Sequence, residues 1–292
     1  MSNVIYLKFT QISVSQCFSG FLRKSVKECQ LLEIGINCGG SLDSKIGVIQ
    51  SPPNLPGWDN ISITKLFQQK YNVPVFLQND ANACVLVEWK IGAVKRSKNM
   101  IFMTLRIGLR NGLILNGKLY ADTNDLDCEI GHIRLDEGDP EVYRKKGSFE
   151  GFCSGSGIIR MAQIMAVEKM EKGARVSFCE SLDAVQNITK KDVAIAAAEG
   201  DKAAIVAFDK SAKYRGIGLS ILIDILNPEC IIIGSVYSRN PHLFNVVCIS
   251  VIEKEALEPT WKVCEIVPAE LGDKIGNFVN LIAAIDGVDG LK

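Results

Sequence analysis

The feature that most constrains the fold is an alternation, between residues 31 and 105, of short apolar runs with longer amphipathic stretches. LLEIGINCGG, VPVFLQND and NMIFMTL have the residue types of β-strands, whereas ISITKLFQQKYN and ANACVLVEWKIGA have apolar residues at helical spacing. Strands that alternate with helices predict an α/β architecture. A chain of 292 residues is long enough for two domains of ordinary size.

The second half of the chain is predicted to be mainly helical after a long loop. Residues 136–157 are rich in glycine, serine and charged residues, which is typical of a loop. Residues 191–226 are alanine-rich and predict two helices that break near Gly200, the second ending at Asn227-Pro228. CIIIGS then predicts a buried strand that delivers Gly234 to a loop, and IGNFVNLIAAID predicts a closing helix.

The charge balance and the cysteines narrow the class of protein. Because 33 Lys and Arg residues balance 33 Asp and Glu residues, we expect neither a nucleic-acid partner nor a membrane surface. No apolar run reaches the ~18 residues that a transmembrane helix needs, and the N-terminus lacks the continuous apolar core of a signal peptide. The ten cysteines include no C-x-x-C pair, which favours a reducing, cytoplasmic compartment over a disulfide framework.

One candidate site lies in FLQNDANAC, where a strand is predicted to end and a helix to begin. Open α/β sheets place ligands at such strand ends. The carboxylate of Asp80 could accept a proton from a substrate hydroxyl there, and Asn79 could bind a neighbouring hydroxyl. The alternative is that Asp80 only caps the helix.

Three further segments carry candidate ligands. In CEIGHI, Glu129 and His132 would share one face of a helical turn, and the alternative is a surface turn or a structural histidine in the core. In KKGSFEGF, Glu150 is either a pocket residue or an exposed loop charge. In SPPNLPGW, prolines hold Asn54 near Trp58, a pairing common around sugars, although a purely structural turn would have the same sequence.

The segment TLRIGLRNGLILNGKLY raises the question of a phosphate. Gly108 and Gly112 follow an apolar strand, and glycines at such positions let a ligand approach the backbone closely. Arg106 and Arg110 could either hold a phosphate or block it.

Together these segments resemble the ROK family of sugar kinases and sugar-responsive repressors. IGINCGGSLDSKIGVIQSPPNLPGW, VFLQNDANA, GLILNGKLY, CEIGHI, GSFEGFCSGSGI and ILNPECIIIGS follow one another in the family's order from about Leu31 onward. The resemblance implies an α/β, two-domain, actin-like ATPase (ribonuclease H-like) fold in which sugar and ATP meet in a cleft. It assigns residues 1–97, with a closing helix at 275–292, to a small domain that is incomplete at its N-terminus, and residues 98–274 to a large domain.

The resemblance also implies roles for the candidate residues. Asp80 matches the general base that takes a proton from the sugar hydroxyl as it attacks the γ-phosphate, a contribution typically worth ~10²–10⁴-fold in rate. The residues that match sugar-hydroxyl contacts, with Asn54 the least direct match, are Asn54, Asn79, Glu129, His132 and Glu150.

Many family members also bind zinc through the histidine of E-I-G-H and three cysteines. Alignment backward from Glu150 places Glu141, Tyr143 and Ser148 at the cysteine positions. A closed tetrahedral zinc site needs those thiolates. The resemblance is therefore to the zinc-free variant, and we predict no structural zinc.

The nucleotide side departs from the family pattern. We recognise no leading strand with a D-x-G-G-T loop before Ile34, and this lead-in is shorter than is usual in the family. The second loop, usually G-T-G-x-G-x-G, has Arg106, Ile107 and Arg110 in place of Gly, Thr and Gly. A side chain hinders close approach to the backbone, and at a position with φ > 0 it adds strain of roughly 1 kcal/mol or more. We expect an impaired phosphate site that keeps Gly108, Gly112 and Gly234.

The expected function is ATP- and Mg²⁺-dependent phosphorylation of a hexose or an N-acetylhexosamine, with doubtful activity. The alternative is a catalytically inactive sugar-binding protein or a truncated kinase remnant. A repressor is not expected, because the 30 or so residues before Leu31 are too few for a helix-turn-helix. A homodimer is compatible with the resemblance, since family members commonly form dimers or tetramers.

Overall fold

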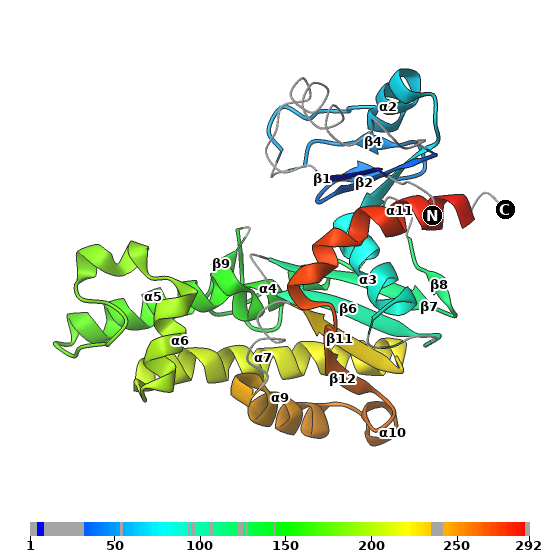
Figure 1. The fold of residues 1–292 in the computed structure, drawn as a ribbon. Coiled ribbons are helices and arrows are strands. Elements are labelled where there is room, and N and C mark those ends of the chain that lie inside the picture. Colours follow the sequence, from blue (N-terminus) through cyan, green and yellow to red (C-terminus); the bar gives the residue numbers. More distant parts are fainter. Residues whose placement is uncertain are drawn as a thin grey trace. The chain divides into compact units, whose positions relative to one another are not determined.

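The computed structural model describes residues 5–8, 32–52, 55–92, 94, 97–105, 108–121, 125, 128–142, 144–234 and 242–289 (Figure 1). The chain forms two compact units. Unit 1 comprises Met1–Lys98, Gly112–Asp127 and Glu270–Lys292, and unit 2 comprises Asn99–Asn111 and Cys128–Ala269. Each unit is described by itself.

Unit 1 contains a parallel three-stranded sheet in the order β1-β2-β5. Its strands are β1 (Ile5–Lys8), β2 (Ile34–Cys38) and β5 (Val75–Asn79). Every residue of β2 is buried, as expected for a central strand of a parallel sheet. The presence of β1 corrects the sequence analysis, which recognised no leading strand before Ile34: the segment IYLK pairs in register with β2, from Ile5 with Ile34 to Lys8 with Asn37.

The described residues of unit 1 also form three helices and a hairpin. The helices are α2 (Ile63–Tyr71), α3 (Asp80–Lys90) and α11 (Val279–Asp289), the last preceded by the 3₁₀ turn η3 (Gly272–Asn277), and the hairpin pairs β3 (Leu42–Asp43) with β4 (Val48–Ile49). Helix α11 packs on β2 so closely that a Cβ at Gly35 would lie 2.1 Å from the Asn280 carbonyl oxygen. Glycine at this position is therefore required by packing.

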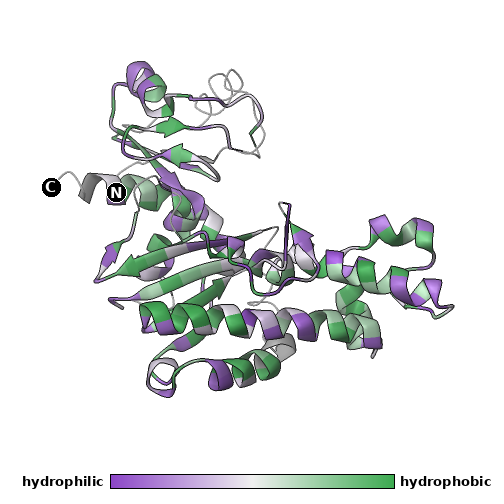
Figure 2. Ribbon diagram, turned by 180° about the vertical axis from the view of Figure 1, so that it is seen from behind, coloured by the Kyte–Doolittle hydropathy of each residue, from purple (hydrophilic) through white to green (hydrophobic). Residues whose placement is uncertain are grey.

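A second sheet has the strand order β12-β11-β6-β7-β8. Its strands are β6 (Met100–Leu105), β7 (Leu109–Leu115), β8 (Lys118–Leu119), β11 (Cys230–Gly234) and β12 (Glu265–Pro268). Strand β11 runs parallel to both β6 and β12 and is buried along its whole length, as the run CIIIG predicted. Figure 2 shows hydrophobic residues predominating along these strands.

The described helices of unit 2 pack mainly around the long helix α7 (Lys202–Leu226), which contacts each of the others and can be followed in Figure 1. They are α4 (Phe149–Cys153), α5 (Gly155–Glu171), α6 (Lys190–Ala198), α9 (His242–Glu255) and α10 (Glu258–Trp261). Short elements link them: the 3₁₀ turns η1 (Ile130–His132) and η2 (Leu182–Asn187), and a hairpin of β9 (Glu141–Val142) and β10 (Lys145–Lys146).

Local sequence signals located some of these boundaries and missed others. The break between α6 and α7 is confirmed at Gly200 (φ 92°), and α7 ends at Asn227 (φ 42°), directly before the proline. The prediction of a continuous loop at 136–157 is wrong, because α4 and the first turn of α5 lie within it. Ser148 and Ser154 cap these helices by accepting hydrogen bonds from Gly151 and Gly157.

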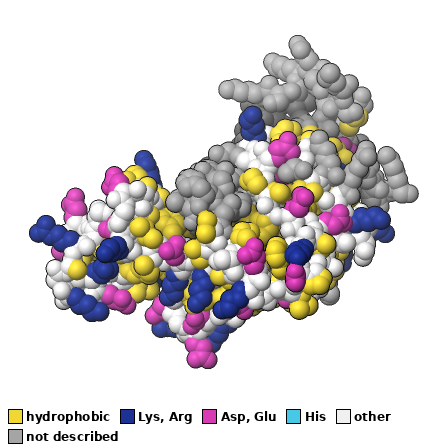
Figure 3. All heavy atoms as spheres, turned by 90° about the horizontal axis from the view of Figure 1, so that it is seen from below, with side chains coloured by type: hydrophobic (Ala, Val, Ile, Leu, Met, Phe, Trp, Pro, Cys, Tyr) yellow, Lys and Arg dark blue, Asp and Glu magenta, His cyan; other side chains and the backbone are white. Residues whose placement is uncertain are grey.

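The surface carries charges of both signs. Figure 3 shows one face on which basic and acidic side chains are interspersed, in keeping with the formal net charge of zero. Among the helices that the structure describes, none combines the length and the apolar character needed to cross a membrane.

Candidate functional site

The first pair of candidate residues lies where β5 passes into α3. Asn79 is the N-cap, and its side-chain oxygen accepts a hydrogen bond from the Ala81 N–H at 2.9 Å. Asp80 is the first residue of the helix and is half-buried. The alternative that Asp80 caps the helix is therefore wrong, since Asn79 has that role. A carboxylate in the first turn is also favoured by the positive end of the helix dipole.

The second pair lies on the 3₁₀ turn η1. The Oε2 atom of Glu129 is 3.9 Å from Nε2 of His132, so the two side chains share one face as their spacing predicted. Each side chain is 54% exposed. The alternative of a histidine in the core is wrong, because both side chains are more than half exposed, whereas the alternative of a surface turn is compatible with this exposure.

Glu150 is buried, being only 8% exposed, so the alternative of an exposed loop charge is wrong. It is the second residue of α4, and its Oε2 atom accepts a hydrogen bond from the Leu109 N–H at 2.7 Å. Backbone glycines surround it: a Cβ at Gly108 would lie 2.7 Å from Oε2, and one at Gly131 would lie 3.3 Å from the Glu150 Cβ.

Within unit 2 the backbone brings η1 and α4 together. The Phe149 N–H donates to the Ile133 carbonyl at 2.8 Å, and the Leu135 N–H donates to the Gly147 carbonyl at 2.8 Å. These bonds join the segment after η1, residues 133–135, to residues 147–149 at the start of α4. Glu129 and His132 come just before the first segment and Glu150 just after the second, so the three candidates come from adjoining turns.

The loop between these turns is also anchored on α7. The Tyr214 hydroxyl donates a hydrogen bond to the Asp136 carboxylate, and the Tyr214 ring stacks on Phe152 with centroids 3.6 Å apart. This hydrogen bond holds the pKa of Asp136 below its ordinary value. Burial, together with the neighbouring carboxylate, raises the pKa of Tyr214 to about 12. At neutral pH the donor is therefore protonated and the acceptor ionised.

The residues at the family's cysteine positions do not fit zinc. Glu141 is exposed in β9, the Ser148 hydroxyl caps α4, and Tyr143 lies outside the described residues. Among the residues that the structure describes, no group of three or more His, Cys, Asp or Glu side chains could hold a metal ion. A side chain that is already used as a helix cap cannot stand in for a thiolate ligand.

The nucleotide-side segment is described only in part. Arg106 and Ile107 lie outside the described residues, whereas Arg110 lies in β7 without a positive φ, so no backbone strain arises there. A Cβ at Gly112 would lie 2.7 Å from the Ala81 carbonyl oxygen, and one at Gly234 would lie 3.2 Å from the Phe102 ring. Packing within the protein thus accounts for a glycine at position 112, and the nucleotide-side roles of Gly108, Gly112 and Gly234 stay predictions.

The segment SPPNLPGW is described except for Pro53 and Asn54. Asn54 lies outside the described residues, and its role stays a prediction. Trp58 is 4% exposed and belongs to the hydrophobic core of unit 1 with Ile34, Leu55 and Phe67. The Trp58 ring is therefore part of the hydrophobic core, and it is not exposed for stacking on a sugar beside Asn54.

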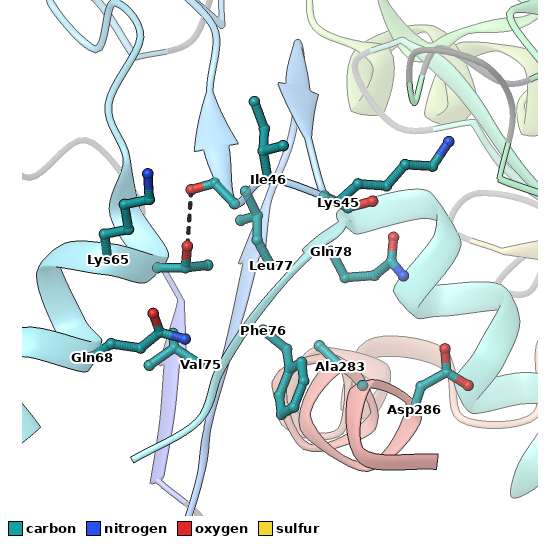
Figure 4. A pocket seen from close by; sticks show the side chains of 14 residues that line it. Lys45, Ile46, Lys65, Gln68, Val75, Phe76, Leu77, Gln78, Ala283 and Asp286 are labelled. Atoms are coloured by element: carbon teal, nitrogen blue, oxygen red, sulfur yellow. Dashed lines mark hydrogen bonds between the residues drawn. The ribbon is translucent and has the colours of Figure 1, made fainter. Parts of the chain in front are cut away.

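A cavity of about 410 Å³ lies elsewhere in unit 1, between α2, β5, α11 and the turn of the β3–β4 hairpin (Figure 4). None of the candidate residues lines it. The Thr64 hydroxyl there donates to the Gly47 carbonyl at 3.3 Å, the contact drawn in Figure 4, and the Asp286 carboxylate pairs with Lys90 at 3.3 Å. Thr64 and Asp286 thus already have partners in the protein, and we assign no ligand to the cavity.

Comparisons with known proteins agree on one group of relatives. A family model described as the ROK family matches residues 14–284. The chain is 29% identical to a xylose repressor of Caldicellulosiruptor bescii over 84% of this chain and 63% of the repressor, and 32% identical to a glucokinase of Halalkalibacterium halodurans over 72% of this chain and 62% of the glucokinase. The chain thus spans less than two thirds of the length of these two relatives.

Solved structures show the same similarity. A ROK family glucokinase from Streptomyces griseus, in complex with glucose and AMPPNP, superposes with a TM-score of 0.70 at 27% identity, over 88% of this chain and 82% of the glucokinase. A ROK hexokinase from Thermus thermophilus superposes with a TM-score of 0.73 at 24% identity, over 90% of this chain and 81% of the hexokinase, and supports the fold alone.

Proposed function

The chain belongs to the ROK family and has the α/β, actin-like ATPase fold of its kinases, and on that premise we propose that it is a sugar kinase-like protein for a hexose or an N-acetylhexosamine. The observation that carries the proposal is the convergence of η1 and α4 in unit 2. It presents two carboxylates and an imidazole, Glu129, Glu150 and His132, from adjoining turns. Carboxylates and imidazoles are suitable partners for sugar hydroxyls, because each can accept a hydrogen bond from an O–H group.

In the proposed reaction Asp80 acts as general base. Its carboxylate takes the proton of a sugar hydroxyl as that oxygen attacks the γ-phosphate of ATP. Asn79 adds a sugar contact through its amide nitrogen, since its side-chain oxygen is used as the helix cap. Glu129, His132 and Glu150 bind the other hydroxyls, and Asn54 joins them.

ATP and Mg²⁺ belong to the proposal as co-substrate and metal, with no zinc. Phosphoryl transfer depends mostly on positioning and on stabilisation of charge. Gly108, Gly112 and Gly234 mark the nucleotide side, and the arginines near the first two support an impaired phosphate loop. A sugar-binding protein without turnover is therefore the alternative.

The proposal also covers the domain boundaries, the assembly and the cellular compartment. We assign the small sugar-side domain to residues 1–97 with 275–292, and the large domain to residues 98–274. A homodimer is the proposed assembly, and no nucleic-acid partner is proposed because the charges are balanced. The scattered cysteines support a cytoplasmic setting.

A coupled assay of ADP release, run over a panel of hexoses and N-acetylhexosamines beginning with glucose, tests the kinase. The panel should reveal sugar-stimulated turnover that Asp80→Asn lowers by about 10²-fold or more. Turnover that is equal in the two proteins, or absent from both, rejects the proposed kinase activity.

Thermal unfolding with the same sugars tests the alternative. A bound sugar stabilises the fold by RT ln(1 + [L]/Kd), about 2.7 kcal/mol at a hundredfold excess over Kd. A shift with sugar but none with ATP, without turnover, supports a binding protein. No shift with any sugar at millimolar concentration rejects both functions.

A further inference from the structure

We propose that Glu150 has a second role: it is the positioning residue that holds the nucleotide-side segment Gly108–Leu109, and it thereby couples sugar binding to the order of that segment. The holding role depends only on contacts within unit 2. The coupling rests on the proposed function, in which the same carboxylate binds a sugar hydroxyl.

The contact has the geometry of a strong hydrogen bond. The Glu150 Oε2 atom is 2.7 Å from the Leu109 backbone nitrogen, and both residues are buried. Hydrogen bonds to an ionised acceptor are shorter and roughly twice as strong as those between neutral groups. Leu109 is the first residue of β7, so this bond fixes the point at which the strand begins.

The glycines around the carboxylate fit this role. A Cβ at Gly108 would lie 2.7 Å from Oε2 and 3.3 Å from Cδ of Glu150, so a larger residue would displace the carboxylate. A Cβ at Gly131 would lie 3.2 Å from the Leu109 carbonyl oxygen and 3.3 Å from the Glu150 Cβ. The Glu150 carboxylate therefore lies close beside Gly108, a glycine at which the sequence alone suggested the approach of a ligand.

Helix α4 is rigid enough to act as the support. Ser148 caps it, and Phe149 and Phe152 are both completely buried. Gly218 of α7 lies so close to Phe149 that a Cβ there would be 2.4 Å from the ring. Because residues on either side of Glu150 are fixed by packing, the carboxylate cannot follow a displaced Leu109 and instead restrains it.

The same carboxylate can serve a sugar. An ionised carboxylate offers about four acceptor positions on two oxygens. Leu109 uses one position on Oε2, which leaves Oε1 for a hydroxyl. A sugar bound there excludes water that competes for the Leu109 N–H, so sugar and an ordered nucleotide-side segment stabilise each other. Linkage makes the effect reciprocal: an ordered segment raises sugar affinity by the same factor.

Hydrogen exchange of the full-length protein measures the holding role directly, on a peptide that contains Leu109. Glu150→Gln keeps the shape but removes the charge, and Glu129→Gln is the matched control because Glu129 is a proposed sugar contact on an exposed turn. Without sugar, we expect Glu150→Gln to exchange roughly fivefold to tenfold faster at Leu109, as a neutral bond replaces a charged one. Glu129→Gln should exchange at the wild-type rate, and peptides of α7 should be unchanged in both.

Glu150→Asp supplies a second variant if the amide variant does not fold, since it keeps the charge and withdraws the carboxylate from Leu109. Wild-type exchange at Leu109 in a folded Glu150 variant overturns the holding role, as does equal acceleration in Glu129→Gln. Added sugar at saturating concentration should slow exchange at Leu109 in the wild type but not in Glu150→Gln, and sugar binding without that slowing overturns the coupling. If no sugar binds the wild type while Glu150→Gln still exchanges faster, the proposed function fails and the holding role stands.

Discussion

Gly218→Ala tests how tightly the support of Glu150 is packed. The new Cβ would lie 2.4 Å from the Phe149 ring, whereas carbon atoms in contact are about 3.5–4.0 Å apart, so the ring or α7 must move by more than ~1 Å. Overpacking of this kind costs typically 1–3 kcal/mol. The helix gains about 1 kcal/mol, because alanine is the better helix former. We therefore expect a net loss of about 0–2 kcal/mol, which opposes the gain that helix propensity alone predicts.

Urea unfolding of the wild type, Gly218→Ala, Phe149→Leu and the double variant gives the measurement. The smaller leucine relieves the clash, so the double variant should be more stable than the sum of the two single changes by at least ~0.5 kcal/mol. If Gly218→Ala is more stable than the wild type by about 1 kcal/mol and the two changes are additive, the close contact with Phe149 is refuted. A displaced Phe149 also moves the adjacent Glu150, so exchange at Leu109 should rise in Gly218→Ala and not in the double variant.

Asn79→Ala removes the cap of α3 and should lower the free energy of unfolding in urea by about 0.5–2 kcal/mol, and an unchanged midpoint would contradict the capping role. In Tyr214→Phe the pKa of Asp136 should rise toward its ordinary value of 3.8. A lowered carboxyl pKa stabilises the fold above the ordinary value, and this contribution is lost as the pH falls through the lowered pKa. Acid titration followed by carboxyl NMR signals should therefore show Asp136 protonating at higher pH in the variant, whereas identical curves would reject the Tyr214 contact. Chelation with EDTA should leave the melting temperature unchanged, and a metal assay that finds stoichiometric zinc would overturn the zinc-free prediction.

Local chemistry in the sequence was sufficient for the long elements. The strand CIIIG and the end of α7 at Asn227 were predicted because an apolar run and an Asn-Pro pair act through neighbouring residues alone. Helix α4 was missed because its five residues have weak helical propensity. It is stabilised by the Ser148 cap and by the burial of Phe149 and Phe152, and burial depends on residues distant in the sequence.

In the candidate site, too, local features could be predicted from the sequence and long-range contacts could not. The spacing of Glu129 and His132 predicted a shared face, because three residues make almost one helical turn. The partner of Glu150 could not be predicted, since it is a backbone N–H 41 residues away and no residue type marks it. For Trp58 the sequence left a sugar contact and a structural turn open, and its burial follows from packing in unit 1 that its Pro-rich neighbours do not reveal.

Gly147 has a consequence for mutational screens of this protein. Its φ is 68°, and a Cβ there would fall 1.6 Å from the Asp136 carbonyl oxygen, a separation shorter than any non-bonded contact. In saturation mutagenesis every substitution at this position will score as damaging, whether the selected trait is catalysis, carbohydrate uptake or simple abundance. Loss of function on substitution of Gly147 therefore reports the geometry of a turn. Position 147 should be left out when mutational data are used to locate catalytic residues.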